Sequence, residues 1–184
     1  MAKDKVKFYH VNKDYLKFLR QEEIKERGFT RIPEYTYENN QKFVCGVILS
    51  INGFEYYAPI SSFKTQQHSN ILITDKKNNV LSSIRFCFMF PVPKSEVSTK
   101  DFSKESFKHQ RLLFKEYGFC LIHIDDIYKK SKEIYDLIID TSDTKLTNNY
   151  CDFKFLQHSM MKYLKLKEIK EALEQVASIT EERK

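Results

Sequence analysis

The sequence contains few of the residues that divide a chain into loops and linkers. Its 184 residues include four glycines, four prolines and no tryptophan. No stretch has the Gly/Ser-rich or Pro-rich composition of a linker between domains, so we expect one domain over residues 1–184, with a helical C-terminal tail over 165–184. The 15 phenylalanines and 11 tyrosines supply apolar surface for its core.

Long apolar runs are also absent. Residues 1–12 alternate charged and apolar side chains and lack the apolar stretch of a signal peptide. No later segment approaches the roughly 18 apolar residues that cross a membrane. These absences predict a cytoplasmic protein without a membrane partner.

Metal and nucleotide motifs are missing as well. The cysteines never form a C-x-x-C pair, the five histidines show no H-x-x-x-H spacing, and no G-x-x-x-x-G-K loop occurs. We therefore expect no metal and no cofactor. The free thiols are expected to be reduced and buried; they are Cys45, Cys87, Cys120 and Cys151.

The sequence has an excess of positive charge. Its 31 lysines and arginines outnumber 25 acidic residues, for a net charge of +6. This balance favours a polyanionic partner without identifying one.

Hydrophobic periodicity predicts a β-rich first half. Asn52-Gly53 joins two apolar runs and is typical of a type I′ hairpin turn. Asn12 or Asp14 could cap a short helix that follows the first strand. The expected strands are 5–11, 43–51, 54–60, 71–74 and 82–92, the last two joined by a turn at 77–79.

After Pro93 the pattern becomes helical. Helices are expected around 107–117, over 125–139 and from 151 onward. An apolar stripe continues through the charged tail, and we expect it to dock on the domain, with a contact between protomers as the alternative. Its members are Leu166, Ile169, Leu173 and Val176. The fold class is therefore α+β, a twisted antiparallel sheet surrounded by helices.

The segment YYAPISSFK, residues 56–64, carries the candidate chemistry. Pro59 cannot donate to a β-ladder, so pairing is expected to end before Ser61, leaving Ser61, Ser62 and Lys64 in a loop. These residues match the S-x-x-K pattern of serine–lysine acylases, but the acylases have it at the start of a helix and add S-D-N and K-T-G motifs that are absent here. Two hydroxyls and a lysine can instead hold a phosphate, and a solvated turn is the third interpretation.

Several segments, taken in order, resemble the ToxN/AbiQ family, the endoribonuclease toxins of type III toxin–antitoxin systems. They are KFYHVNKDYLKFL, YENNQK, the strand with Gly46, APISSFK, SSIRFCFMFPVP, KHQRLLFKEYGF and CDFKFLQHSMMKYL. The resemblance implies a sheet related in architecture to the Kid and MazF toxins. It also implies metal-independent RNA cleavage to a 2′,3′-cyclic phosphate and a 5′-hydroxyl, a part in abortive infection against phage, and cellular or phage RNA as substrate.

The same resemblance implies a partner and site residues. The partner is a repeat-derived antitoxin RNA pseudoknot, which the toxin processes and with which it forms a closed ring. The family's essential serine falls on Ser62, its neighbour on Ser61 and its lysine on Lys64. The upstream tyrosine and lysine fall on Tyr37 and Lys42, as candidates for proton transfer or for stabilising the leaving oxygen.

Further basic residues are candidates for binding RNA. Arg85 alternates with Ile84 and Phe86 along a predicted strand. Phe107 and Phe114 lie among basic residues on one predicted helix, a composition suited to phosphate contacts and base stacking, or to an ordinary solvated helix. The candidates are His68, Arg85, Lys108, His109, Arg111 and Lys115. A non-catalytic RNA-binding module remains the alternative to the endoribonuclease.

Overall fold

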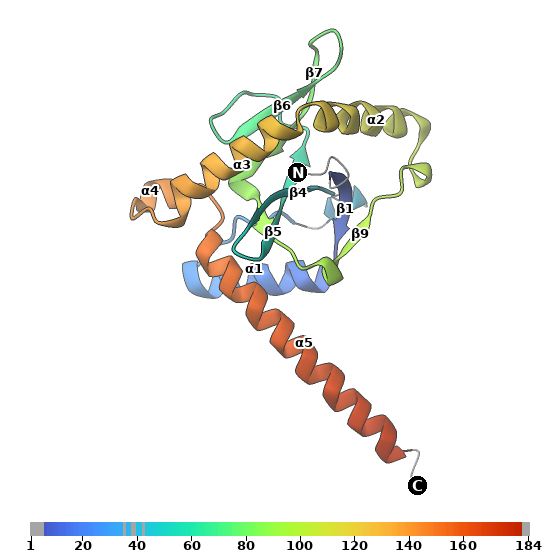
Figure 1. Cartoon of the computed structure of the whole chain (residues 1–184), viewed down its shortest axis with the longest axis vertical. Coiled ribbons are helices and arrows are strands. Elements are labelled where there is room, and N and C mark those ends of the chain that lie inside the picture. Colours follow the sequence, from blue (N-terminus) through green and yellow to red (C-terminus); the bar gives the residue numbers. More distant parts are fainter. Residues whose placement is uncertain (1–5, 35, 38–39, 42, 182–184) are drawn as a thin grey trace.

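An antiparallel sheet forms the centre of the molecule (Figure 1). The computed structural model describes residues 6–34, 36–37, 40–41 and 43–181. Among these residues the strand order is β6-β7-β5-β4-β1-β9, with β8 also paired to β5, and β2 and β3 form a separate pair. The strands are β1 Lys7–Val11, β2 Thr36–Tyr37, β3 Asn40–Gln41, β4 Val44–Ile51, β5 Phe54–Ser61, β6 Asn70–Thr74, β7 Val80–Arg85, β8 Phe90–Pro91 and β9 Val97–Thr99.

Helices surround this sheet, as the predicted α+β class requires. α3 packs on β4, where Ser131 Oγ donates to the Ile48 carbonyl at 2.8 Å, while α2 packs on β6 and α1 on α5. The α-helices are α1 Lys13–Arg27, α2 Phe107–Ile122, α3 Ile124–Ile139, α4 Thr144–Thr147 and α5 Phe153–Glu181; the 3₁₀ turns are η2 Phe86–Phe88, η3 Lys94–Glu96 and η4 Phe102–Lys104.

Two local predictions are confirmed at the first helix and the central hairpin. Asn12 caps α1 by accepting the Asp14 N–H at 2.8 Å. Asn52 and Gly53 have φ of 51° and 81°, the positive values that the turn between β4 and β5 requires. Within this hairpin Gly46 leaves room for the Tyr57 ring, because a Cβ there would lie 2.0 Å from a ring carbon. The hairpin therefore fixes the register of β5, the strand that ends at Ser61.

The predicted end of β5 is wrong. Pairing does not stop before the serines: Pro59 lies opposite Val44 of β4, and Ile60 and Ser61 then pair with Ile84 and Ser83 of β7. Pro59 is tolerated because β5 changes partner at this point, from β4 to β7. Ser61 therefore belongs to the strand, and only Ser62 onward forms the loop.

The second half of the sheet departs from the prediction in two further places. The run 82–92 is not one strand, because η2 interrupts it and β8 turns back to pair with β5. After Pro93 the chain forms β9 before any α-helix, and β9 pairs with β1. η2 and β9 are three residues long, and so short a segment carries too little periodicity to be recognised from the sequence.

The core lies between the sheet and the helices. Phe8, Tyr56 and Phe153 are among its largest fully buried side chains. All four cysteines are free and buried, as predicted. No helix among the described residues combines the length and the apolar character needed to cross a membrane.

α5 is packed at its start and projects from the body further on (Figure 1). Lys162 and Lys167 bind Glu22 and Glu96, which fixes the middle of the helix to the domain. The predicted docking of the apolar stripe is wrong. Its side chains are exposed: Leu166 49%, Ile169 49%, Leu173 65% and Val176 62%.

Candidate RNA-cleavage site

The serine turn begins where β5 ends. Ser61 is half-buried, and its Oγ accepts the N–H of Phe63 at 3.2 Å. Ser62 and Lys64 are exposed. Lys64 makes no ion pair within the part of the chain that the structure describes. The turn therefore presents one hydroxyl and one cation to solvent while Ser61 stabilises its backbone.

Buried polar groups from the neighbouring strands hold this turn. Ser83 Oγ donates to the Phe63 carbonyl at 2.7 Å, and Asn70 Nδ2 donates to the Thr65 carbonyl at 2.9 Å. The Asn70 Oδ1 in turn accepts the Gln67 N–H at 2.9 Å. Because Ser83 and Asn70 are at most 1% exposed, these bonds fix residues 63–67 against β6 and β7.

Arg85 lies at the same turn. Its guanidinium carbon is 4.3 Å from the centre of the Phe63 ring and 4.9 Å from that of Phe88. Its Nη2 donates to Gln67 Oε1 at 3.3 Å, whereas its buried Nε has no partner among the described residues. The aromatic rings thus hold a permanent positive charge beside the serines.

A cavity of about 510 Å³ opens beside Arg85. Its walls come from the loop before β6, the end of β7 and the α4 region, which lie far apart in the sequence. Burial raises the pKa of the Tyr150 phenol, while a hydrogen bond with Ser69 acts the other way, so Tyr150 stays a neutral donor at physiological pH. The polar residues of the wall are Arg31, Gln67, His68, Ser69, Arg85, Asn149 and Tyr150.

His68 stands at the rim of this cavity rather than free in a loop. Its Nε2 lies 3.0 Å from Glu133 Oε1 on α3, and both side chains are about half exposed. The pKa of Glu133 is lowered by Lys130 first and by His68 to a smaller extent. The contact ties the loop before β6 to α3.

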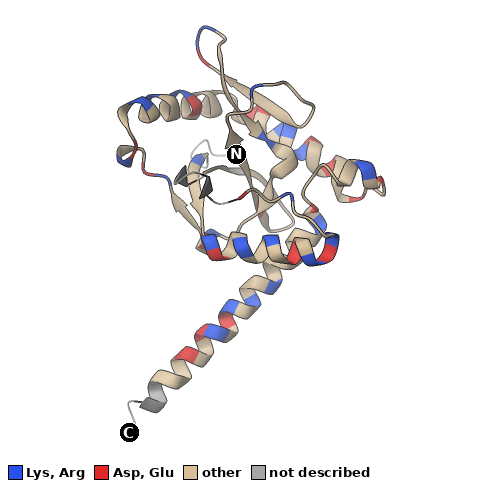
Figure 2. Ribbon diagram, turned by 180° about the vertical axis from the view of Figure 1, so that it is seen from behind, with Lys and Arg blue, Asp and Glu red and all other residues tan. Residues whose placement is uncertain are grey.

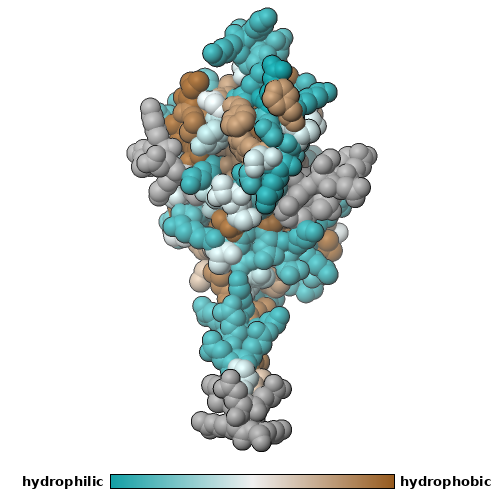
Figure 3. All heavy atoms as spheres, turned by 90° about the vertical axis from the view of Figure 1, so that its right-hand side faces the viewer, coloured by the Kyte–Doolittle hydropathy of each residue, from teal (hydrophilic) through white to brown (hydrophobic). Residues whose placement is uncertain are grey.

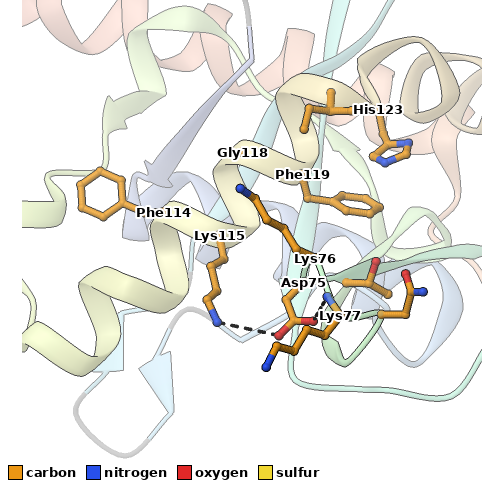
Figure 4. A pocket seen from close by; sticks show the side chains of 11 residues that line it. Asp75, Lys76, Lys77, Phe114, Lys115, Gly118, Phe119 and His123 are labelled. Atoms are coloured by element: carbon orange, nitrogen blue, oxygen red, sulfur yellow. Dashed lines mark hydrogen bonds and ion pairs between the residues drawn. The ribbon is translucent and has the colours of Figure 1, made fainter.

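Of the α2 candidates, Lys115 lines a second groove, shown in Figure 4. Lys115 Nζ is 3.8 Å from Asp75 Oδ2 at the end of β6 opposite Asn70. With about 3.3 Å per strand residue, this places Lys115 some 15 Å along β6 from the serine turn. The structure therefore does not bring Lys115 together with Ser62.

The groove at Lys115 has a volume of about 660 Å³ and is the larger of the two. Phe114 and Phe119 line its apolar side, and the Phe119 ring stacks on His123 at 4.2 Å (Figure 4). Its lining includes the exposed lysines Lys76 and Lys77, but the hydroxyl beside them, on Thr74, is half-buried, so its size does not make it the candidate for phosphate chemistry.

The remaining α2 candidates differ in availability. Lys108 and Arg111 are exposed, and Arg111 lies 5.9 Å from the Phe107 ring centre. His109 Nδ1 is 3.1 Å from Glu105 Oε2, so part of its surface is already engaged. Lys108 and Arg111 are therefore the two α2 candidates that make no ion pair among the described residues.

The two upstream candidates are only partly placed. Tyr37 belongs to β2, opposite Asn40 of β3, and Lys42 lies outside the described residues. β3 ends shortly before Val44, whose partner in β5 is Pro59. The segment that carries both candidates therefore enters the sheet beside the strand that ends in the serines.

Several residues of the site were not predicted from the sequence. Asn70, Ser83, Phe88, Arg31 and Tyr150 hold the turn or line the cavity. Tyr150 follows Arg85 by more than sixty residues, and no local motif links them. The only available signal was the polar run before β6, where a buried asparagine commonly closes a loop.

The chain is similar to known toxins over most of its length. Residues 7–161 match the family model described as Toxin ToxN, type III toxin-antitoxin system. The chain is 26% identical to Endoribonuclease ToxN of Pectobacterium atrosepticum over 163 residues, which cover 83% of this chain and 90% of the relative. It is 27% identical to Endoribonuclease AbiQ of Lactococcus lactis subsp. lactis over 173 residues, covering 87% and 90%.

Solved structures share the fold. A toxin studied for its selective inhibition by a non-coding RNA pseudoknot superposes with a TM-score of 0.75 at 22% identity, covering 87% of this chain and 98% of that one. The structure of AbiQ, a lactococcal anti-phage endoribonuclease, superposes with a TM-score of 0.73 at 24% identity and the same coverage.

Proposed function

Because the chain belongs to the ToxN toxin family of type III toxin–antitoxin systems, we propose that it is an endoribonuclease toxin acting at the serine turn. It cleaves RNA without a metal by attack of the 2′-hydroxyl on the neighbouring phosphorus. The products are a 2′,3′-cyclic phosphate and a 5′-hydroxyl. The substrate supplies its own nucleophile, so the protein has to position the phosphate, stabilise charge and move protons.

One observation carries the proposal: an exposed hydroxyl and two cations meet at one rigid turn. Ser62 and Lys64 are exposed there, and Arg85 is held against Phe63 of the same turn. In the proposed complex Ser62 donates to a phosphate oxygen, and Lys64 and Arg85 stabilise the charge of the crowded transition state. Ser61 keeps its structural role through the Phe63 N–H.

The proton transfers are assigned to the segment before β4. As the 2′-oxygen bonds to phosphorus it loses its proton to a base, and as the bond from phosphorus to the 5′-oxygen breaks that oxygen gains one. We propose Tyr37 and Lys42 for these steps, since their segment enters beside β5. The roles of base and acid between the two stay open.

The RNA is proposed to continue from the turn into the cavity at Arg85. Arg31 and Arg85 supply charge there, and Phe88 and Tyr150 supply ring surfaces. His68 lies at the rim of this path. The basic face of α2, with Lys108, His109, Arg111 and Lys115, is a separate contact surface for a longer RNA.

The proposed inhibitor, targets and cellular role rest on the membership of the family. The proposed inhibitor is an antitoxin RNA pseudoknot cut from repeats by the toxin and assembled with it in a closed ring. The proposed targets are cellular or phage RNAs in the cytoplasm, with abortive infection as the outcome. A relation of the sheet to the Kid and MazF toxins remains part of the proposal.

The test is cleavage of an end-labelled, A-rich RNA in EDTA, beside the same RNA with single deoxyribose substitutions. The wild-type protein is expected to leave a 2′,3′-cyclic phosphate and to fail to cleave after a deoxyribose, which lacks the attacking hydroxyl. Ser62→Ala is expected to lose cleavage, whereas Ser98→Ala, an exposed serine on the far edge strand β9, keeps it.

Each other outcome decides against a part of the proposal. Cleavage that survives in Ser62→Ala places the chemistry elsewhere, and cleavage that needs a metal refutes the mechanism. Binding without cleavage by the wild-type protein supports an RNA-binding module instead.

A further inference from the structure

The projecting half of α5 carries an apolar stripe with coiled-coil spacing. Leu166, Ile169, Leu173 and Val176 follow one another at intervals of three, four and three residues, which are the a and d positions of two heptads. Each is about half exposed or more. Figure 3 shows this part as a narrow stalk whose viewed face is hydrophilic. The helix is thus amphipathic where it has left the domain.

This part of the helix lies beyond the family match. The family match ends at residue 161. The structural neighbours are covered to 98% while 87% of this chain is used. An exposed stripe beyond the end of the family match calls for a partner rather than for a place in the core.

We propose that the partner is a second copy of this chain, paired antiparallel through α5. In a parallel pair the flanking g and e positions would set Lys165 against Lys170 of the other copy, a contact between like charges. An antiparallel pair with its axis at the level of Glu171 replaces the two Lys165–Lys170 contacts by one contact between Lys170 and Lys170 of the other copy. It seats Leu166 against Val176 of the other copy and Ile169 against Leu173.

Charge also favours this orientation. Lys170 and Glu174 already lie 3.8 Å apart within one helix. In the antiparallel pair Lys170 is as close in level to Glu174 of the other copy as to Lys170 of that copy, so the two glutamates can offset the single contact between lysines. Figure 2 shows charged residues of both signs along this helix. Ala172 and Ala177 flank the seam and let the helices approach closely.

The lengths fit. In this register residue 161 of one copy is level with residue 181 of the other, an overlap of about 30 Å at 1.5 Å per residue. The overlap covers the projecting part and also the turns that Lys162 and Lys167 hold to the domain. The two domains then stand at opposite ends of the pair, and both serine turns remain open to RNA. The inference is independent of the proposed cleavage chemistry.

The test is the mass of the full-length, RNA-free chain by sedimentation over a range of concentrations. The mass is expected to rise toward that of a dimer. Leu173→Glu is expected to weaken association at least about tenfold, the effect of placing a charge in an apolar seam. Gln175→Glu, which adds the same charge on the outer face, is the matched control and should still dimerise.

Orientation is tested by single added cysteines under mild oxidation. Ala172→Cys lies near its own copy across the antiparallel axis and should cross-link, whereas Val176→Cys should not. Cross-linking through residue 176 alone would overturn the antiparallel pair. A monomer at every concentration, a dimer that survives Leu173→Glu, or a dimer that forms only with RNA would overturn the proposal.

Discussion

Two polar regions of this molecule use their hydrogen-bonding capacity in opposite ways. Near the end of α1, Glu23 is fully buried and accepts from Arg27 at 2.7 Å, from Thr30 at 2.6 Å and from the Arg31 N–H at 2.9 Å. At the serine turn, Ser62 and Lys64 face solvent, and the bonds are made by the groups beneath them. Saturated groups hold the fold, and unsaturated groups on a rigid support are available to a ligand.

The largest loss of stability is expected when the fully hydrogen-bonded carboxylate of Glu23 is removed. Glu23→Ala leaves the Arg27 guanidinium, only 11% exposed, without its carboxylate. We expect a loss of about 3–5 kcal/mol in the free energy of unfolding, measured by urea denaturation. Glu26→Ala, an exposed neighbour on the same helix, should change it by less than about 0.5 kcal/mol. Equal losses in the two variants would mean that α1 contributes through its helix alone.

The reverse result is expected at the turn. Ser62→Ala should lower the rate of RNA cleavage by about 100- to 1,000-fold, since one donor to the developing charge is lost. The free energy of unfolding should stay within about 0.5 kcal/mol, because the exposed Ser62 side chain makes no hydrogen bond to the described residues. A variant that is also clearly less stable would show that Ser62 serves the fold, and the comparison between the two regions would fail.

Ser83 belongs to both regions and should give a mixed result. Ser83→Ala removes the bond to the Phe63 carbonyl and leaves that carbonyl without its buried donor. We expect about 1–2 kcal/mol lower stability together with slower cleavage, as the turn loosens. Ser82→Ala is the control: Ser82 is buried next to it but makes no bond to the turn. Slower cleavage in both variants would point to the strand rather than to the Phe63 bond.

The support of the site was harder to predict from the sequence than its exposed residues. Asn52-Gly53 and the Asn12 cap were predictable because their chemistry is local. The partner change of β5 at Pro59 was not, because a proline reports only a missing donor and not which strand lies beside it. The burial of Ser83 and the pairing of Arg85 with Phe63 likewise depend on β7 lying next to β5.

The prediction that the α5 stripe docks on the domain was wrong for a related reason. Helical periodicity identifies an apolar face but not its neighbour. Lys162 and Lys167 are held by Glu22 and Glu96, which come from distant parts of the sequence, and the helix leaves the domain beyond them. The spacing predicted the helix correctly and its docking wrongly.

The smallest of the expected effects concerns the ion pair between Lys100 and Glu105, which is less buried than the groups around Glu23 and less exposed than Ser62 and Lys64. Lys100 is nearly buried and its Nζ lies 2.5 Å from Glu105 Oε1. This hydrogen bond is the main cause that holds the pKa of Glu105 below its ordinary value of 4.5, with His109 adding less. A carboxyl whose pKa is lower in the folded state binds more protons when unfolded. Its stabilising contribution is therefore full above pH 4.5 and is lost as the pH falls through the lowered value.

Lys100→Met should remove this contribution. We expect about 1 kcal/mol lower stability at neutral pH and a flatter decline of stability below pH 4.5, measured by denaturation at a series of pH values. Lys104→Met is the control, because Lys104 is 82% exposed and lies 4.0 Å from its partner Asp101. An unchanged acid limb in Lys100→Met would mean that other carboxylates, such as Glu22 with its pKa lowered by Lys162 and Lys25, govern acid unfolding. The Lys100–Glu105 pair would then contribute as little to stability as the open groups of the serine turn, although Lys100 is buried like the saturated groups around Glu23.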